Sequence, residues 1–138
     1  MASRPGAPRL LTLAASHYCE KARWGLERAG IRYGEECHAP GVHRVIVARH
    51  RAGITVPILL TGDRRIGGSA AILHYADTIA PPELRLYPED PAARAEVEAL
   101  ERRFDDVLAP ASRPLAYWFI LPHPDILYSR TDHARSRP

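Results

Sequence analysis

Hydrophobic residues recur with two different periods along the first eighty residues of the chain. The run 10–13 holds three leucines and predicts a short strand buried on both faces. From residue 17 to residue 29 the apolar side chains recur at helical spacing, with Ser16 in place to cap the helix and Gly30 in place to end it. The segment 31–38 brings every second side chain to one side, which is typical of a strand. Together these segments predict a parallel βαβ unit.

A second helix and a pair of strands are predicted next. Residues 42–52 have a weaker helical pattern, which predicts a helix closed by Gly53. The segment 56–60 is apolar, and because Pro57 removes a donor from the strand ladder, it belongs at the start of a strand or at a sheet edge. A tight-turn signal of Thr, Gly and Asp then predicts that residues 64–67 return antiparallel.

The third helix completes the order of elements. Ser69 precedes an apolar face over residues 70–79, so the sequence predicts a helix that Ser69 caps. The resulting order is βαβ-α-ββα. This is the thioredoxin arrangement, in which helices cover both sides of a mixed sheet, and it places the chain in the α/β class.

Helical signals continue after a break at Pro81-Pro82. Asp90 is followed by proline, which predicts a capped helix with proline at its first position; this helix ends near Pro110, and the apolar run 115–121 follows. We therefore expect a thioredoxin-like domain followed by a short all-α remnant. The expected divisions are a flexible lead-in over 1–8, the thioredoxin-like domain over 9–80, a linker over 81–90, a partial all-α domain over 91–128 and a tail over 129–138.

Composition and charge exclude several classes of protein. The chain is 46% hydrophobic and 25% charged, which is ordinary for a soluble globular protein and excludes a collagen, a coiled coil or a wholly disordered chain. Residues 1–80 carry eleven basic against six acidic side chains, whereas residues 81–128 carry five against nine, so no nucleic-acid partner is expected. The apolar runs are too short for a membrane helix. Having only two cysteines favours a reducing cytoplasm.

Three strings in the predicted βαβ-α-ββα region resemble one known family. They are Ser-His-Tyr-Cys-Glu-Lys-Ala-Arg-Trp at 16–24, Val-Pro at 56–57 and Gly-Ser-Ala-Ala-Ile-Leu at 68–73. In this order they resemble the N-terminal domain of soluble glutathione transferases over residues 9–80, and more weakly to residue 128. The resemblance implies a transferase that takes glutathione as co-substrate and activates its thiol for conjugation to a small electrophile, a detoxification reaction. It also implies a homodimer.

The resemblance also implies which residues act on glutathione. Ser16 is the counterpart of the catalytic serine or cysteine at the start of the first helix, where it would stabilise the thiolate. Lowering a thiol pKa by about 2 units takes about 2.7 kcal/mol, which a hydroxyl donor beside a helix N-terminus can supply. In this family Pro57 would follow a cis peptide bond that exposes the backbone of Val56 to the tripeptide, and Ser69 would bind the γ-glutamyl carboxylate. The implied glutathione-binding residues are Tyr18, Val56, Pro57, Gly68 and Ser69.

Each of these residues also has a plainer interpretation. Serines such as Ser16 and Ser69 often cap helices without any ligand, and most prolines follow a trans peptide bond. Gly68 stands where the family usually has glutamate or glutamine, which removes one contact to the γ-glutamyl amino group. The helical part after residue 81 is shorter than the domain that supplies the family's electrophile pocket, so the electrophile cannot be named. The alternative function is a noncatalytic thioredoxin-fold module that binds glutathione or another protein.

The cysteines and histidines predict structural roles. Cys19 stands where a glutaredoxin-like CxxC motif has its second cysteine, and Ser16 replaces the first cysteine, so dithiol chemistry is excluded. We interpret Cys19 and Cys37 as core residues. A residual thiol-redox role for Cys19 is a third hypothesis. His43 and His50 share a helix face without a carboxylate partner, so no metal is expected.

Two further patterns concern the surface. Glu20, Arg23 and Glu27 are spaced for exposed ion pairs on the first helix. The apolar segment 117–121 needs a cover, because monomers rarely leave so large an apolar patch in water. This segment independently favours a homodimer.

Overall fold

A computed structural model describes residues 7–51, 53–128 and 135–136 of the chain. The predicted lead-in over 1–8 and the predicted tail over 129–138 therefore lie largely outside the described residues. Within the predicted tail, two residues add a short edge strand to the sheet, as set out below.

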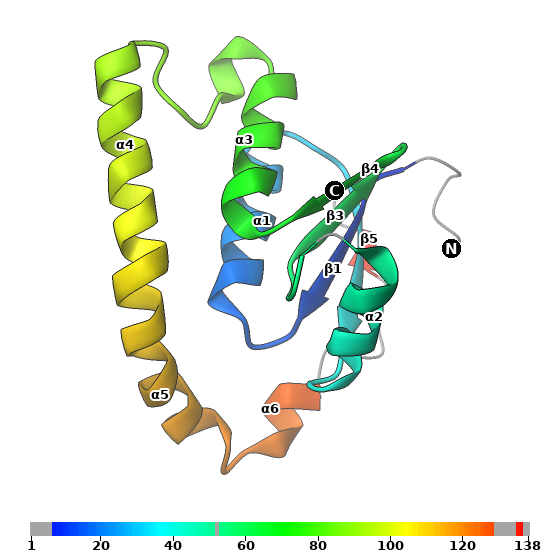
Figure 1. Cartoon of the computed structure of the whole chain (residues 1–138). Coiled ribbons are helices and arrows are strands. Elements are labelled where there is room, and N and C mark those ends of the chain that lie inside the picture. The colour runs from blue at the N-terminus through cyan, green and yellow to red at the C-terminus, as the bar shows by residue number, and fades with distance from the viewer. Residues whose placement is uncertain (1–6, 52, 129–134, 137–138) are drawn as a thin grey trace.

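The sheet is mixed, and its first four strands follow one another along the chain as predicted (Figure 1). The strands are β1 (Arg9–Leu13), β2 (Gly34–His38), β3 (Ile58–Thr61), β4 (Arg64–Gly67) and β5 (Arg135–Ser136). Their order across the sheet is β4-β3-β1-β2-β5. β1 pairs parallel with β2 and antiparallel with β3, and β3 pairs antiparallel with β4.

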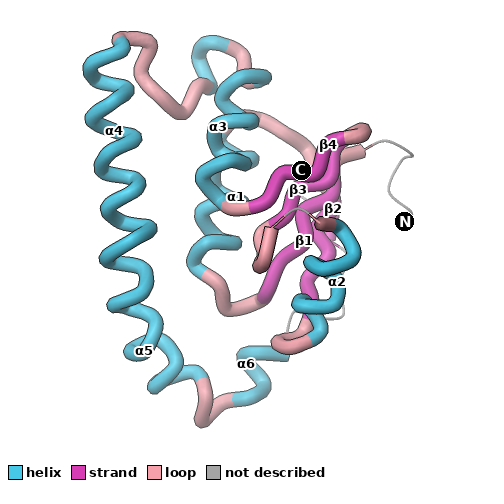
Figure 2. The backbone as a smooth tube through the Cα atoms, in the orientation of Figure 1, coloured by secondary structure: helices cyan, strands magenta, loops and turns pink. Residues whose placement is uncertain are grey.

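Helices cover both faces of the sheet (Figure 2). α1 (His17–Arg28) and α3 (Ser69–Ile79) pack side by side on one face, and α2 (Val42–His50) lies on the other. The two neighbouring residues Leu10 and Leu11 are fully buried and point into different cores, one under α1 and α3 and one under α2. The prediction that this strand is buried on both faces is confirmed, and the fold is thioredoxin-like.

A glycine sets the distance between α1 and α3. A Cβ atom at Gly25 would come within 2.5 Å of Leu73 Cδ1, so a larger residue would force the Leu73 side chain to move. The two helices therefore approach closely at this point, in the C-terminal half of α1.

Two predicted helix ends are wrong in detail. The helix predicted over 42–52, with Gly53 closing it, ends at His50, and Arg51 follows in the left-handed conformation (φ 51°). Ser69 does not cap α3, because the helix already begins at Ser69 and its hydroxyl makes no capping bond. Gly68 occupies the cap position with φ 89°, a backbone conformation that favours glycine.

The predicted end near Pro110 is also wrong, because one long helical segment runs past it (Figure 1). After the 3₁₀ turn Pro82–Leu84, α4 (Pro91–Arg103) leads through a π-helical turn (Phe104–Leu108) into α5 (Ala109–Ile120), and α6 (Pro124–Tyr128) follows. Ala109 N–H donates to the Phe104 carbonyl, five residues back. In this register the Asp105 carbonyl would pair with residue 110, which is proline and has no N–H. The Tyr18 hydroxyl donates to that carbonyl at 2.8 Å.

The surface ion pairs predicted on the first helix are partly wrong. Arg23 is fully buried and pairs with Glu35 of β2 at 2.6 Å, and Glu35 also accepts a hydrogen bond from the Thr12 hydroxyl at 2.7 Å. Only Glu20, 2.6 Å from Arg23, lies at the surface of this network. The spacing of the three residues on the helix cannot reveal that a carboxylate from a strand completes the pair.

The described part of the chain contains no helix that combines the length and the apolar character needed to cross a bilayer.

Candidate functional site

A cavity beside Ser16 gathers side chains from separate parts of the chain. Its volume is about 490 Å³. Its lining comes from the loop between β1 and α1, the first turn of α1, the start of α2, residues 55–56 ahead of β3, and one side of α5. Of the predicted site residues, Ser16, Tyr18 and Val56 meet here. Pro57, Gly68 and Ser69 lie outside the lining.

Ser16 sits at the N-terminus of α1, as predicted. Its backbone is extended, and its Oγ accepts a hydrogen bond from the Cys19 N–H at 3.4 Å. A serine hydroxyl can accept and donate at once, so capping the helix leaves the O–H available to a sulfur atom. The positive end of the α1 dipole favours an anion at the same place.

A buried polar network supports the loop that carries Ser16. The Arg23 guanidinium, held by Glu35, also donates to the Leu13 carbonyl at 3.4 Å, and the Leu13 N–H contacts Cys19 Sγ at 3.4 Å. Leu13, the last residue of β1, is thereby bound through its carbonyl and its N–H to two side chains of α1, across the loop 14–16. This network holds both ends of the loop that carries Ser16.

Cys19 is a core residue, as interpreted from the sequence. Its side chain is fully buried, and it packs with Leu11 and Ile58. Burial raises the pKa of the Cys19 thiol, although hydrogen bonds with Ser16 and Leu13 act in the opposite direction. The thiol is therefore protonated at neutral pH, and this does not favour a nucleophilic role.

The Val56-Pro57 peptide bond is cis, as the resemblance implied. The Val56 side chain is buried against the core and borders the cavity. Among the described residues, the main-chain N–H and carbonyl of Val56 form no hydrogen bond with another main-chain group. The Pro57 carbonyl accepts from the Gly68 N–H at 2.9 Å, which places the buried Ser69 one residue beyond this contact.

Tyr18 contributes its ring to the cavity rather than a free hydroxyl. The hydroxyl is engaged with the Asp105 carbonyl, and the ring stacks obliquely on His17 with centroids 4.2 Å apart. The guanidinium carbon of Arg113 lies 5.9 Å from the centre of the Tyr18 ring. Burial, followed by the positive charge of Arg113, lowers the pKa of His17, so His17 is neutral at pH 7.

The contribution of α5 was missed by the sequence reasoning. Arg113, Tyr117 and Leu121 line the cavity, and their spacing of four residues would have placed them on one helix face. The proline at 110 concealed this pattern, because the preceding helix was predicted to end near it, whereas Pro110 and Pro114 both lie within α5. The cavity thus has a wall that the predicted site did not include.

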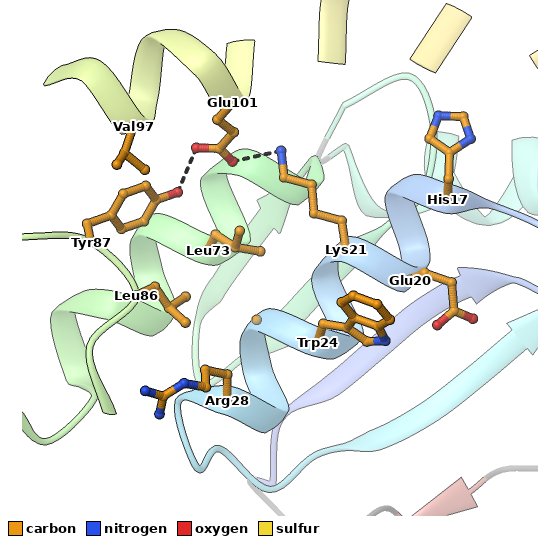
Figure 3. Close-up of a pocket in the computed structure, with 11 residues that line it drawn as sticks. His17, Glu20, Lys21, Trp24, Arg28, Leu73, Leu86, Tyr87, Val97 and Glu101 are labelled. Atoms are coloured by element: carbon orange, nitrogen blue, oxygen red, sulfur yellow. Dashed lines mark hydrogen bonds and ion pairs between the residues drawn. The ribbon is translucent and has the colours of Figure 1, made fainter. Parts of the chain in front are cut away.

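A second cavity of about 640 Å³ lies between α1, α3 and α4 (Figure 3). Its apolar wall includes Trp24, Leu73 and Val97. Three of its polar side chains are bound to one another: the Tyr87 hydroxyl donates to Glu101 at 2.8 Å, and Lys21 pairs with Glu101 at 2.7 Å. Because this chain of polar groups is internally satisfied, we assign the candidate site to the cavity beside Ser16, where a hydroxyl and a helix N-terminus meet.

Residues 10–84 match the family model described as the N-terminal domain of glutathione S-transferase. No curated protein matches the chain in sequence.

Solved structures with the same arrangement extend the comparison beyond residue 84. The glutathione S-transferase from Sinorhizobium meliloti 1021 matches with a TM-score of 0.72 and 25% identity, over 87% of this chain and 55% of its own. The theta class glutathione S-transferase from Xanthomonas axonopodis pv. citri, with glutathione bound, matches with a TM-score of 0.71 and 26% identity, over 94% of this chain and 61% of its own. A glutathione transferase homologue from Drosophila mojavensis, also with bound glutathione, matches with a TM-score of 0.69 and 27% identity, over 80% of this chain and 52% of its own. The present chain spans between half and two thirds of the length of these proteins.

Proposed function

Because the chain belongs to the glutathione S-transferase family, we propose that it binds glutathione in the cavity beside Ser16 and activates the glutathione thiol for conjugation to an electrophile. The observation that carries the proposal is the placement of the Ser16 hydroxyl at the N-terminus of α1, on the wall of an open cavity. Bound glutathione in the homologues from Xanthomonas axonopodis pv. citri and Drosophila mojavensis supports it.

In the proposed reaction, the thiol of glutathione releases its proton to solvent and binds as the thiolate. The Ser16 hydroxyl donates to the sulfur, and the α1 dipole adds a smaller contribution. A hydrogen bond to a charged group contributes about 1.5–3 kcal/mol and a helix N-terminus about 0.3–1 kcal/mol. Together these terms are large enough to lower the thiol pKa by about 2 units. The thiolate then forms a C–S bond to the electrophile, which gives up its leaving group or takes up a proton.

The rest of the tripeptide would lie along Val56 and towards α3. The unpaired main-chain groups of Val56 can pair with the cysteine of glutathione as one strand pairs with the next. Beyond the Pro57–Gly68 hydrogen bond, the first turn of α3 and the Ser69 hydroxyl would receive the γ-glutamyl carboxylate. Gly68 has no side chain to add a contact there, which predicts weaker binding than in relatives with glutamate or glutamine at this position.

Substitutions at Ser16 test the proposal. Ser16→Ala removes the hydroxyl, and we expect the rate of conjugation of a generic aromatic electrophile to fall roughly ten- to hundredfold, the equivalent of one hydrogen bond to a charged sulfur. Ser16→Thr keeps both the hydroxyl and the cap and should retain most of the rate. Steady-state kinetics, with the glutathione Kd from calorimetry, separate loss of thiol activation from loss of binding. A wild-type protein that does not bind glutathione at millimolar concentration would refute the proposal.

The second candidate function is a noncatalytic module that retains the scaffold. Two observations favour it: Gly68 lacks the usual contact, and α5 presents Trp118 and Phe119 largely to solvent, 77% and 66% exposed. Such a module would show no conjugation, and Ser16→Ala would leave the binding of a partner protein unchanged.

We also infer how the protein is organised and where it acts. The division into a glutathione-binding domain over 9–80, a linker over 81–90 and a partial helical domain over 91–128 fits the thioredoxin-like fold and the long helix after it. The exposed apolar side of α5 supports a homodimer in which a second copy covers it. Both cysteines are free and buried, which fits a cytoplasmic protein, and conjugation of electrophiles would serve detoxification.

A further inference from the structure

The charge of the cavity beside Ser16 is unbalanced. Of the residues that line it, Arg113 carries the one permanent charge, and no aspartate or glutamate is present. The two lining histidines bring no negative charge that could balance the charge of Arg113. His17 is neutral at pH 7, and the ring of His43 accepts a hydrogen bond from the Gly41 N–H at 3.1 Å. The cavity wall formed by α5 is therefore positive.

Arg113 is held at the cavity but is not neutralised there. Its guanidinium lies over the Tyr18 ring, and that ring is fixed in turn by the Tyr18 hydrogen bond to Asp105. Lys21 pairs with the Asp105 carboxylate at 2.6 Å, so this acidic group of the π-helical turn is already engaged. Within the described ranges, Arg113 has no ion pair or hydrogen bond of its own. An arginine in this state can bind a carboxylate through two parallel N–H groups.

The rest of the α5 wall is apolar or aromatic. Ala116, Tyr117 and Leu121 lie on the same side of the helix as Arg113 and line the same cavity. Ser16, at the start of α1, lines the same cavity. A molecule that fills this space would place an apolar body against α5 and an anionic group at Arg113.

We propose that Arg113 makes this protein selective for apolar or aromatic electrophiles that carry a carboxylate. This inference rests on the proposed function and names the class of its second substrate. The reacting carbon would face the sulfur at Ser16, and the carboxylate would pair with the guanidinium. The pair is partly open to water, so its contribution is modest: we expect about a fivefold preference for the charged compound over its neutral analogue.

Two conjugates of glutathione test the inference without requiring turnover. S-benzylglutathione and S-(4-carboxybenzyl)glutathione differ only in the carboxylate, and calorimetry gives the Kd of each. Wild-type protein should bind the carboxybenzyl conjugate about fivefold more tightly, and the preference should shrink in high salt. In Arg113→Gln the two affinities should become equal. Arg103→Gln, on α4 and outside the cavity lining, is the matched control and should keep the wild-type preference.

The possible outcomes separate this inference from the proposed function. Equal affinity of wild-type protein for the two conjugates overturns the inference while glutathione binding stands. An equal loss of affinity for both conjugates in Arg113→Gln also overturns it, because Arg113 would then act on the glutathione part. If wild-type protein binds neither conjugate nor glutathione itself, the proposed function fails, and this inference fails with it.

Discussion

At the scale of single residues, the site depends on a charge pair that is hidden beneath it. Arg23 and Glu35 are buried, and together with Thr12 they hold the end of β1 against α1, where the loop carrying Ser16 begins. The position of Ser16 at a helix start could be predicted, because capping is local in sequence. The burial of Arg23 could not, since a helical spacing of three or four residues is the same for an exposed pair and for a pair completed by a strand.

Removal of one partner from this pair should be costly. Glu35→Gln removes the buried counter-charge of the Arg23 guanidinium and leaves it only the partly exposed Glu20, and we expect the free energy of unfolding to fall by about 3 kcal/mol. Glu36→Gln is the neighbouring control, because Glu36 pairs with Arg9 at the surface at 2.7 Å and should cost less than about 1 kcal/mol. Urea denaturation measures both. Equal effects of the two substitutions would mean that the buried pair does not support the loop.

At the scale of elements, Asp77 of α3 holds the segment that leads into the long helix. Its carboxylate accepts from the Leu86 and Tyr87 N–H groups at 2.8 and 3.0 Å and from Arg94 of α4 at 3.1 Å. The order of strands and helices up to residue 79 was predictable from hydrophobic periods together with cap and turn residues. The anchoring of the linker was not, because it depends on a single side chain meeting backbone groups nine and ten residues away.

The anchor makes stability depend on pH. Burial opposes ionisation of Asp77, but the Tyr87 and Leu86 N–H groups and the Arg94 guanidinium outweigh it, so its pKa lies below the usual 3.8. A carboxyl group with a lower pKa in the folded state contributes stability that is present above the unfolded pKa and is lost as pH falls through the folded value. Stability should therefore decline below about pH 4.

The variant Asp77→Asn isolates this contribution. It should lose about 1–2 kcal/mol at pH 7 and show a shallower decline in acid, because the titrating group is gone. Thermal unfolding followed at several pH values measures both effects. Asp63→Asn, in the exposed turn between β3 and β4, serves as the comparison and should follow the wild-type curve. An Asp77→Asn curve parallel to that of the wild type would show that Asp77 is not the group responsible.

At the scale of the whole molecule, polar contacts join the long helix to the thioredoxin-like part, whereas its apolar side chains stay exposed. Lys21 with Glu101 and Asp105, and Asp77 with Arg94, bridge the two parts. The exposed apolar residues of this segment include Leu100, Phe104, Val107, Leu108, Leu115, Trp118, Phe119 and Leu121. The need for a cover over 117–121 was predicted from the apolar run in the sequence. The cavity wall at Arg113 was not, because it exists only once α5 continues past Pro110 and passes the start of α1.

This apolar surface predicts self-association. In sedimentation equilibrium at micromolar concentration, the wild-type chain should form a dimer, and the double substitution Trp118→Asp with Phe119→Asp should shift it towards the monomer. Ile54→Asp alters an exposed apolar residue, 95% accessible, in the segment between α2 and β3, and should leave the dimer intact. A wild-type protein that stays monomeric throughout would exclude a homodimer.

The ionisation of glutathione bound to the protein tests the central claim most directly. Ultraviolet absorption of the thiolate, followed as pH is raised, gives the pKa of the bound thiol. We predict a midpoint roughly 2 units below that of a free cysteine thiol, about 6.5 against about 8.5, and a return towards the free value in Ser16→Ala. A midpoint that does not differ between bound and free glutathione would contradict the account.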